Sequence, residues 1–244
     1  MKTLVLPRFG NFDSARMWRA ARDAGWQTYD LPIDLSCPKF EGQVAAYGDG
    51  RTARHAAEAN DLELVAPPAD WLLTLPKTYV QREIEAVRYN ELEKSSTPRF
   101  IKCADIKWFY PTVYVDEVPS KHREMPEDEL VLVQEPVEWL YEFRYFILDR
   151  EIRTSCQYKL MGVPSSDPGG GWVTQPWNER DAREFLDIFM LENVEIPEAT
   201  VIDVGFIKDR GWAIVEANPA YGSGIYDCNP RQVLEVVERA CVQR

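Results

Sequence analysis

The segment Val201–Tyr226 constrains the fold of this chain most, because it reads as two apolar strands joined by a tight turn at Asp209-Arg210. If that turn has two residues, counting back along both strands sets Asp203 opposite Glu216. Asn218 shares the face of Glu216, since side chains alternate along a strand. The pattern therefore predicts a hairpin that carries two carboxylates and an amide oxygen at one end.

Two ionised carboxylates this close repel each other unless a cation lies between them. A set of oxygen ligands suits Mg2+, which usually keeps water and binds one or two carboxylates together with substrate phosphates. A surface hairpin with solvated acids would carry the same residues. However, the acids interrupt strands that are otherwise apolar, and a loop of small residues, Pro219–Gly224, follows them directly. These surroundings favour a site.

A family resemblance lies in this same segment, VIDVGFIKDRGWAIVEANPAYGSGIY, which is similar to the C-terminal metal-binding segment of ATP-grasp ligases. It most resembles a compact, RimK-related clade of bacterial and phage proteins. The resemblance implies that Asp203, Glu216 and Asn218 bind the Mg2+, or Mn2+ in its place, that bridges the phosphates of ATP. It also implies an α+β ATP-grasp fold, in which two lobes clasp ATP, preceded by a small α/β preATP-grasp lobe.

Composition limits the partners of the chain. At 244 residues it can bury a sizeable core, and its 45% hydrophobic and 28% charged residues are typical of globular proteins. The 28 Lys and Arg against 40 Asp and Glu give a net charge of −12, which argues against nucleic acid as a partner. The sequence has neither an apolar run long enough to span a bilayer nor a signal peptide, so we expect no membrane association and a cytoplasmic location.

Cysteine and histidine offer little chemistry in this sequence. The five cysteines are scattered without CxxC spacing, which predicts free thiols in a reducing compartment and no zinc site. The two histidines lie in polar surroundings, so catalysis or metal binding by histidine has little to work with.

Three lobes are expected along the chain. Strands alternate with short helices over roughly the first 75 residues, which predicts a small α/β layer whose first helix is capped by Asp13. No GxGxxG motif follows the first strand, so a dinucleotide site would lack its phosphate loop. We expect an N-terminal α/β lobe at 1–77, a central ATP-grasp lobe at 78–134, and a C-terminal ATP-grasp lobe with the metal site at 135–244.

The central lobe is expected to begin with a helix. The capping box Thr78-x-x-Gln81 predicts that this helix continues to about Glu93. Arg82 would lie in it, either solvated or facing the cleft.

Lys102 lies in the middle of an apolar strand. A lysine there is either a gatekeeper of an edge strand or a phosphate ligand. ATP-grasp proteins carry a strand lysine that contacts the α- and β-phosphates, and the resemblance assigns that place to Lys102. Lys107, in the aromatic-rich loop that follows, is a second candidate phosphate contact, although loops commonly carry solvated lysines.

An apolar strand ends at Gln134 and is followed by Glu135-Pro136-Val137. This segment is either a plain interlobe linker or a hinge that offers backbone groups of Glu135 and Val137 to a ligand. The resemblance implies the adenine hinge of an ATP site, and it implies that Glu142 is the acid on the ribose side.

A second hairpin is predicted across Asp149-Arg150. A two-residue turn sets Arg144 opposite Ser155 and places Arg153 on the same polar face. That face is either solvent-exposed or meets the Asp203 face across bound ATP. The Glu-x-Arg pattern ending at Arg144 is another point of similarity to the clade, and it implies that Arg144 stabilises charge on a transferred phosphoryl group, which suits a planar cation.

The glycine-rich segment SSDPGGGW, at 165–172, is a lid, a phosphate contact or a plain connector. From the resemblance we expect ATP-dependent ligation of a carboxylate to an amine, with small-molecule or peptide substrates, through an acyl phosphate. Two alternatives are a nucleotide-binding interaction module without turnover and a hydrolase that uses Asp203 and Glu216 as acid and base. The sequence does not indicate the substrates or the oligomeric state.

Overall fold

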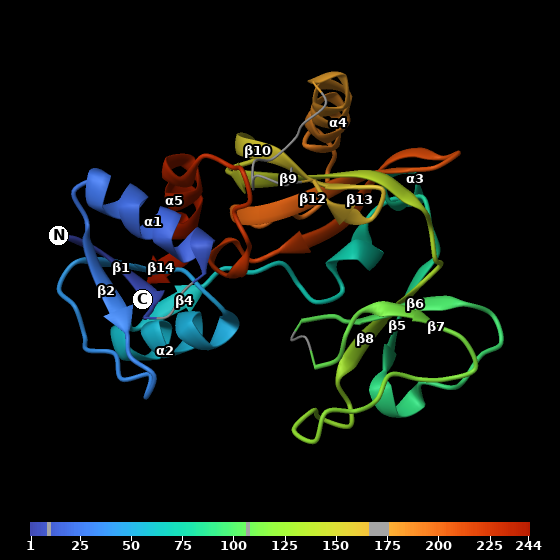
Figure 1. Cartoon of the computed structure of the whole chain (residues 1–244), viewed down its shortest axis with the longest axis horizontal. Helices are drawn as coiled ribbons and strands as arrows, with labels where there is room; N and C mark the ends of the chain where they lie inside the picture. Colours follow the sequence, from blue (N-terminus) through green and yellow to red (C-terminus); the bar gives the residue numbers. More distant parts are fainter. Residues whose placement is uncertain (9–10, 106–107, 166–175) are drawn as a thin grey trace.

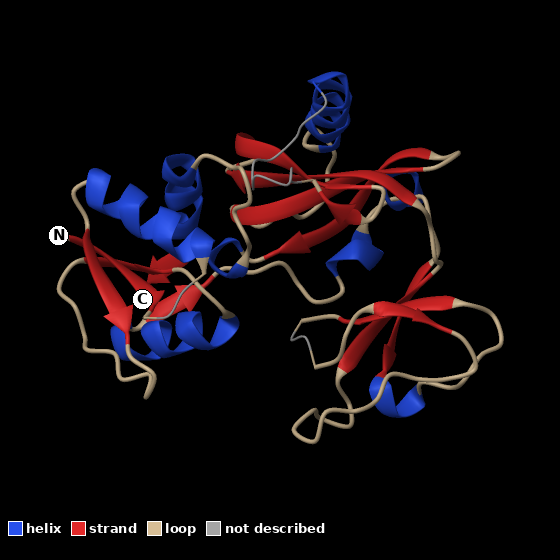
Figure 2. Cartoon of the chain, viewed as in Figure 1, coloured by secondary structure: helices blue, strands red, loops and turns tan. Residues whose placement is uncertain are grey.

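A computed structural model describes residues 1–8, 11–105, 108–165 and 176–244. Two bodies flank a central sheet: the N-terminal elements lie on one side, and a smaller sheet that carries β5 to β8 lies on the other (Figure 1). Strands dominate the central and C-terminal parts, whereas helices lie on both faces of the N-terminal sheet (Figure 2). This mixture confirms the predicted α+β class.

The N-terminal body is a three-stranded parallel sheet in the order β2-β1-β3, covered by two helices. Its elements are β1 (Lys2–Pro7), α1 (Phe12–Asp23), β2 (Gln27–Leu31), β3 (Gln43–Ala46), α2 (Gly50–Asn60) and β4 (Leu62–Leu64). Helix α1 is capped by Asn11, whose side chain accepts from the Ser14 N–H, so the prediction that Asp13 is the cap was wrong. Asp13 is instead used by a loop of the candidate site.

The end of the chain returns to the N-terminal body. Helix α5 (Pro230–Arg239) packs against α1, and β14 (Cys241–Gln243) pairs antiparallel with β4. Valines of α5 share one buried cluster with Leu4 and Met17, since Asn229 and Pro230 start the helix with its apolar stripe facing inward. Helix α5 also packs against β9, β10 and β12, so the end of the chain joins the N-terminal body to the sheet of the C-terminal lobe at 135–244. The three-lobe division stays our proposal.

The predicted helix from Thr78 to Glu93 is largely absent. A single turn, α3 (Lys77–Val80), ends at Gln81, which has a positive φ of 49°, and the chain continues as strand β5. Ile84 and Val87 serve as strand residues, because pairing with β8 satisfies the backbone that a helix would have satisfied internally. The capping-box pattern was thus overridden by tertiary pairing.

The central lobe is a four-stranded sheet in the order β5-β8-β6-β7. Its strands, with the 3-10 turns that flank them, are η1 (Trp71–Thr74), β5 (Ile84–Arg88), η2 (Tyr89–Glu91), β6 (Arg99–Cys103), β7 (Thr112–Tyr114) and β8 (Leu130–Gln134). Lys102 of β6 is opposite Leu132 of β8, so the lysine lies in an inner strand. An inner strand argues against an edge gatekeeper, although the pairing of β6 with β7 ends one residue before Lys102, at Ile101.

The C-terminal lobe is a five-stranded antiparallel sheet in the order β11-β10-β9-β12-β13. Its elements are β9 (Trp139–Leu148), β10 (Glu151–Leu160), β11 (Val163–Pro164), α4 (Pro176–Phe189), β12 (Ala199–Ile207), β13 (Gly211–Asn218) and η3 (Ala220–Gly222). One face packs on α4 through Phe143, Tyr145 and Leu186, and the other packs on the N-terminal body through Phe146 and Val201. The polar site residues lie on this second face.

The 201–218 hairpin reaches its predicted register by an unexpected route. Ile207 pairs with Gly211, so the turn has three residues and not two. A β-bulge then leaves Val215 without a cross-strand partner and restores the pairing of Asp203 with Glu216. The predicted pair is therefore confirmed, although two deviations that cancel produce it.

The β9–β10 hairpin departs from its prediction. Bulges lie between Ile152 and Thr154 and between Gln157 and Lys159, so Arg144 is opposite Cys156 and not Ser155. The predicted polar face of β10, which included Arg153, was therefore wrong, because one extra residue moves every later side chain to the other face.

Among the helices of the described residues, none has the length and apolar character that a membrane span requires.

Candidate functional site

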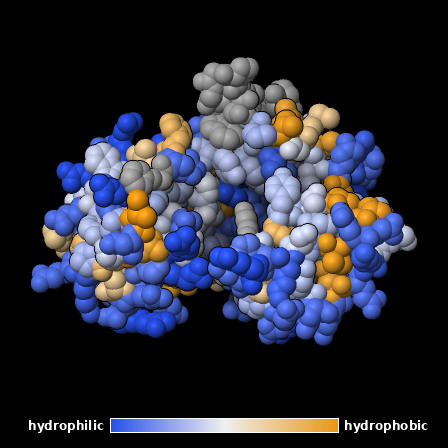
Figure 3. All heavy atoms as spheres, turned by 60° about the horizontal axis from the view of Figure 1, so that its bottom comes forward, coloured by the Kyte–Doolittle hydropathy of each residue, from blue (hydrophilic) through white to orange (hydrophobic). Residues whose placement is uncertain are grey.

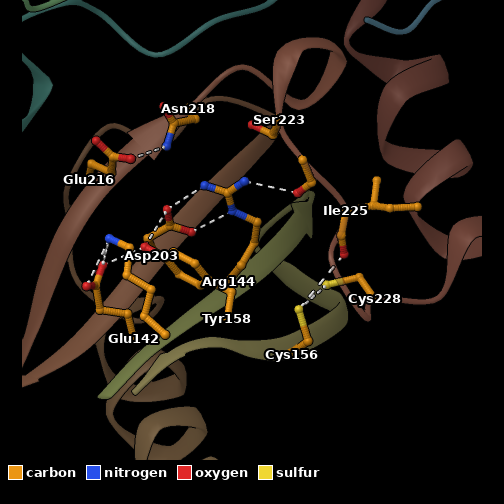
Figure 4. Close-up of polar contacts among 12 residues, drawn as sticks. Glu142, Arg144, Cys156, Tyr158, Asp203, Glu216, Asn218, Ser223, Ile225 and Cys228 are labelled. Carbon is orange, nitrogen blue, oxygen red and sulfur yellow. Dashed lines mark hydrogen bonds and ion pairs between the residues drawn. The ribbon is translucent and has the colours of Figure 1, made fainter. Parts of the chain in front are cut away.

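Three charged side chains form a row across neighbouring strands of the large sheet. Asp203 of β12 is directly opposite Arg144 of β9 on one side and Glu216 of β13 on the other. Side chains directly opposite each other share a face, and Figure 4 shows this row pointing to one side of the sheet. The Arg144 and Asp203 faces were expected to meet across a ligand, but they lie side by side in one sheet.

Arg144 and Asp203 form a buried bidentate ion pair. Arg144 Nε and Nη2 donate to the two carboxylate oxygens of Asp203 at 2.9 and 2.7 Å, and Asp203 is fully buried. The rings of Tyr158 and Tyr226 lie 5.2 and 5.0 Å from the guanidinium carbon. Burial acts to lower the pKa of Arg144, but the negative charge and hydrogen bonds of Asp203 have the larger effect and raise that pKa well above its ordinary value. Burial raises the pKa of Asp203, although the charge and hydrogen bonds of Arg144 oppose that shift. The bidentate geometry holds the pair in place.

Glu216 connects the large sheet to the central lobe. Its carboxylate forms an ion pair with Lys102 of β6, and Asn218 Nδ2 donates to its other oxygen at 3.0 Å. Burial acts to raise the pKa of Glu216, but the charge and hydrogen bond of Lys102, with help from Asn218, lower it far below the usual range. Glu216 is therefore ionised at neutral pH, and 28% of its side chain remains exposed.

Glu142 lies one step further along β9 on the same face. Lys159 Nζ is 3.1 Å from both of its carboxylate oxygens, and the Tyr158 hydroxyl lies 2.7 Å from Oε2. That hydroxyl is also 3.3 Å from Asp203 Oδ2, so Tyr158 links the two acids. Burial raises the pKa of Glu142 despite the opposing effects of Lys159 and Tyr158.

A cavity of about 60 Å3 lies where the lobes meet, and its lining includes Lys102, Asp105, Glu216 and Asn218. The space-filling view shows a hollow between the two halves of the molecule, with hydrophilic residues over most of the visible face (Figure 3). Glu216 and Asn218 of β13 thus line this cavity, whereas Asp203 and Arg144 are buried outside its lining.

The donor set fits Mg2+ in part. Glu216 and Asn218 offer a carboxylate and an amide oxygen beside the cavity, which is the hard-oxygen chemistry that Mg2+ prefers. Both oxygens of Asp203 already accept from Arg144, so Asp203 could contribute only through its remaining lone pairs. Within the described ranges, no three His, Cys, Asp or Glu side chains group together as a metal site.

The other predicted residues lie at varying distances from the row. Glu135 pairs with Arg210, which lowers its pKa to about 2, and its N–H donates to the Glu83 carbonyl at 2.9 Å. Val137 is half-buried in the link between β8 and β9. Arg153 pairs with Glu151 at 3.5 Å and is not brought to the row. Lys107 and most of SSDPGGGW lie outside the described residues.

A loop after β13 ties the site to the N-terminal body. The Gly224 carbonyl accepts from Arg144 Nη1 at 3.0 Å, and the next N–H, of Ile225, donates to Asp13 at 2.9 Å. Tyr47 donates to the Ser223 carbonyl at 2.8 Å, and Arg16 donates to the Cys228 carbonyl at 3.0 Å. The first lobe therefore holds the loop whose carbonyl orients Arg144.

Sequence reasoning missed two residues that the structure places beside the row, Tyr158 and Lys159. Tyr158 is the extra residue of the second bulge of β10 and Lys159 follows it, and no periodic pattern reveals a bulge. Arg82 was expected in a helix, either solvated or facing the cleft. It lies instead after α3 and is buried against two backbone carbonyls of β13.

The chain belongs to the ATP-grasp family: residues 79–236 match the ATP-grasp domain of R2K clade family 2. No curated protein matches the chain. Among solved structures, the RimK domain ATP-grasp protein from Sphaerobacter thermophilus DSM 20745 is 11% identical, with a TM-score of 0.51, and the match covers 97% of this chain and 99% of that one.

Two further solved structures share the fold. D-cycloserine synthetase DcsG is 11% identical with a TM-score of 0.59, covering 98% of each chain. D-alanine–D-alanine ligase from Bacillus anthracis is 10% identical with a TM-score of 0.52, covering 98% of this chain and 97% of that one. These likenesses confirm the ATP-grasp fold.

Proposed function

We propose that this protein is an ATP-dependent ligase that joins a carboxylate to an amine, through an acyl phosphate, with ADP and phosphate as products. Membership of the ATP-grasp family supports ATP as the nucleotide. The fold shared with a D-alanine–D-alanine ligase and a D-cycloserine synthetase supports ligation as the class of reaction. The identities of the acid and the amine are left open.

The observation that carries this proposal is the ion pair between Lys102 and Glu216, which joins the two lobes at the cavity. Phosphate oxygens would accept from Lys102, and Mg2+, or Mn2+ in its place, would bind Glu216 and Asn218 and neutralise phosphate charge. In a metal–nucleotide complex, Lys102 would thus bind the phosphates and Glu216 the metal ion. A hydrolase that uses Asp203 and Glu216 as acid and base is disfavoured, because Arg144 holds both oxygens of Asp203.

Arg144 is the proposed cationic group for the transferred phosphoryl oxygens. Its hydrogen bonds to Asp203 and to the Gly224 carbonyl use three of the five N–H groups of the guanidinium. Asp203 and the two tyrosine rings fix the plane of the guanidinium, so the group does not have to reorient during the reaction. Lys159, beside Glu142, adds a second cation on the same face.

An isotope experiment tests the acyl phosphate. Candidate acids and amines are first screened for ADP release, after a thermal shift with ATP and Mg2+ has shown binding. With the acid labelled by oxygen-18, one label should appear in the released phosphate, because the carboxylate oxygen that attacks the γ-phosphorus leaves with it. Label in AMP would identify an adenylating enzyme, and label kept in the acid would identify a simple ATPase. Either result would contradict the proposal.

Changing Lys102 to alanine should weaken ATP binding by at least about tenfold while leaving adenosine binding within about twofold, because only phosphates interact with the ammonium group. Calorimetric titration with each ligand measures both effects. Lys208→Ala is a matched control, since Lys208 pairs with Glu138 at the exposed hairpin end. An equal loss for ATP and adenosine would show that Lys102 is a structural lysine.

A further inference from the structure

The segment from Val80 to Arg82 runs along the outer edge of β13, the last strand of the large sheet. Gln81 Nε2 donates to the Trp212 carbonyl at 2.6 Å. Arg82 Nη1 and Nη2 donate to the carbonyls of Ile214 and Val215, each at 2.8 Å. Two side chains of the interlobe link thus satisfy the backbone of β13, which is the edge strand of the sheet among the described residues.

Arg82 binds the two carbonyls that flank the β-bulge. In a regular strand, successive carbonyls point to opposite edges, so one guanidinium cannot bind two in succession. The unpaired Val215 turns its carbonyl to the side of the Ile214 carbonyl, and Arg82 bridges both. The geometry of the bulge and the bond pattern of Arg82 therefore depend on each other.

The bulge decides which face carries Glu216. Without the extra residue, the register of Ile207 with Gly211 would set Glu216 opposite Ile202, whose side chain is buried in the cluster under α4. With it, Glu216 is opposite Asp203 and reaches Lys102. One residue of register separates a cleft-facing carboxylate from one that faces the core.

Arg82 is itself held rigidly. Its Nε donates to Gln134 Oε1 at 2.9 Å, Nη1 also donates to the Val80 carbonyl at 3.0 Å, and the Trp139 ring lies 5.1 Å from the guanidinium carbon. Trp139 can lie there because Gly205 has no side chain: a Cβ on Gly205 would be 2.4 Å from the ring. Burial lowers the pKa of Arg82 to about 10, so the guanidinium stays charged at neutral pH.

We propose that Arg82 is a positioning residue, which holds the bulge at Val215 and thereby places Glu216 opposite Asp203 and against Lys102. The expected effect of Arg82 on metal-dependent nucleotide binding rests on the proposed function. Its effect on the register of β12 and β13 does not, because that register can be measured without a ligand. Arg82 acts through the backbone of β13 and is assigned no contact with substrate.

The test compares Arg82→Gln with a matched control, Arg150→Gln. Arg150 also donates to a set of backbone carbonyls, at Met190, Glu192 and Val194, none of which belongs to β13. Fluorescent ATP is bound at increasing Mg2+, and the Mg2+ concentration at half-saturation is measured. We expect this Mg2+ concentration to rise by about 10-fold or more in Arg82→Gln, an effect typical of residues that orient metal ligands. It should change less than twofold in Arg150→Gln. Adenosine affinity should not change in either variant.

A second measurement needs no nucleotide. Cross-strand nuclear Overhauser contacts between Asp203 and Glu216 report the register directly; they should persist in Arg150→Gln and be lost in Arg82→Gln. If Arg82→Gln is too unstable to study, Arg82→Ala with millimolar guanidinium added should recover both the contacts and the Mg2+ response, since the ion can fill the space left by the side chain.

The two proposals fail in different ways. If the unaltered protein shows no Mg2+-dependent nucleotide binding, the proposed function is wrong, and the register measurement still decides the role of Arg82. If Arg82→Gln keeps the Asp203–Glu216 contacts, the positioning role is overturned, whatever happens to nucleotide binding. A Mg2+ midpoint within twofold of the unaltered value would likewise overturn it.

Discussion

Replacing Asp203 by asparagine should lower the free energy of unfolding by about 3–5 kcal/mol, the cost of leaving a buried charge without its partner. The amide keeps the shape of the side chain but no longer neutralises Arg144, which is buried beside the stacked rings of Tyr158 and Tyr226. Urea unfolding followed by tryptophan fluorescence measures the loss. The exposed pair of Arg239 with Glu198 provides a control, and Glu198→Gln should have little effect.

A double variant separates the charge effect from loss of packing. Replacing both partners, with Arg144→Met and Asp203→Leu, removes the two charges together, so most of the stability lost in Asp203→Asn should return. Nucleotide turnover should stay absent in this double variant, because the proposed phosphoryl contact is gone. If the double variant is less stable than Asp203→Asn, the pair stabilises the fold through its geometry, and our account of its energetics is wrong.

Changing Glu216 to glutamine should lower Mg2+-dependent ATP turnover by at least about 100-fold, since a metal ion in a phosphoryl-transfer site stabilises the transition state by several kcal/mol. The change preserves the shape of the side chain and its place beside Asn218 but removes one charge from the proposed cation site. Turnover is measured as ADP release with a substrate pair from the screen. The fold should stay intact by circular dichroism, although loss of the ion pair with Lys102 should lower the melting temperature.

The matched control for Glu216→Gln is Glu138→Gln, an exposed acid that pairs with Lys208 at the same sheet. It should leave turnover unchanged. Turnover at the parent rate in Glu216→Gln with Mg2+ would show that the metal is bound elsewhere, whereas restored turnover with excess Mg2+ would place Glu216 at the metal but outside the transition state.

The sequence alone was sufficient for the parts of this protein that depend on local periodicity and turn chemistry. Alternating apolar and polar residues place Lys102 on a strand and Asp203, Glu216 and Asn218 on one hairpin, and the structure confirms those positions. Asn229-Pro230 likewise marks the start of α5 correctly. These features are predictable because the alternation of side chains along a strand and the residues that start a helix are local properties of the sequence.

The tertiary structure alone decided which charges meet and where strands gain an extra residue. The β10 bulges bring Tyr158 and Lys159 to Glu142, and the Val215 bulge brings Glu216 to Lys102, although the turn before it differs from the prediction. Such deviations follow from contacts between residues far apart in sequence, as with Arg82 and β13, and a period of two residues carries no information about them. The same physical reason makes Ile84–Arg88 a strand within the expected helix: β8 offers it hydrogen bonds that no local pattern could predict.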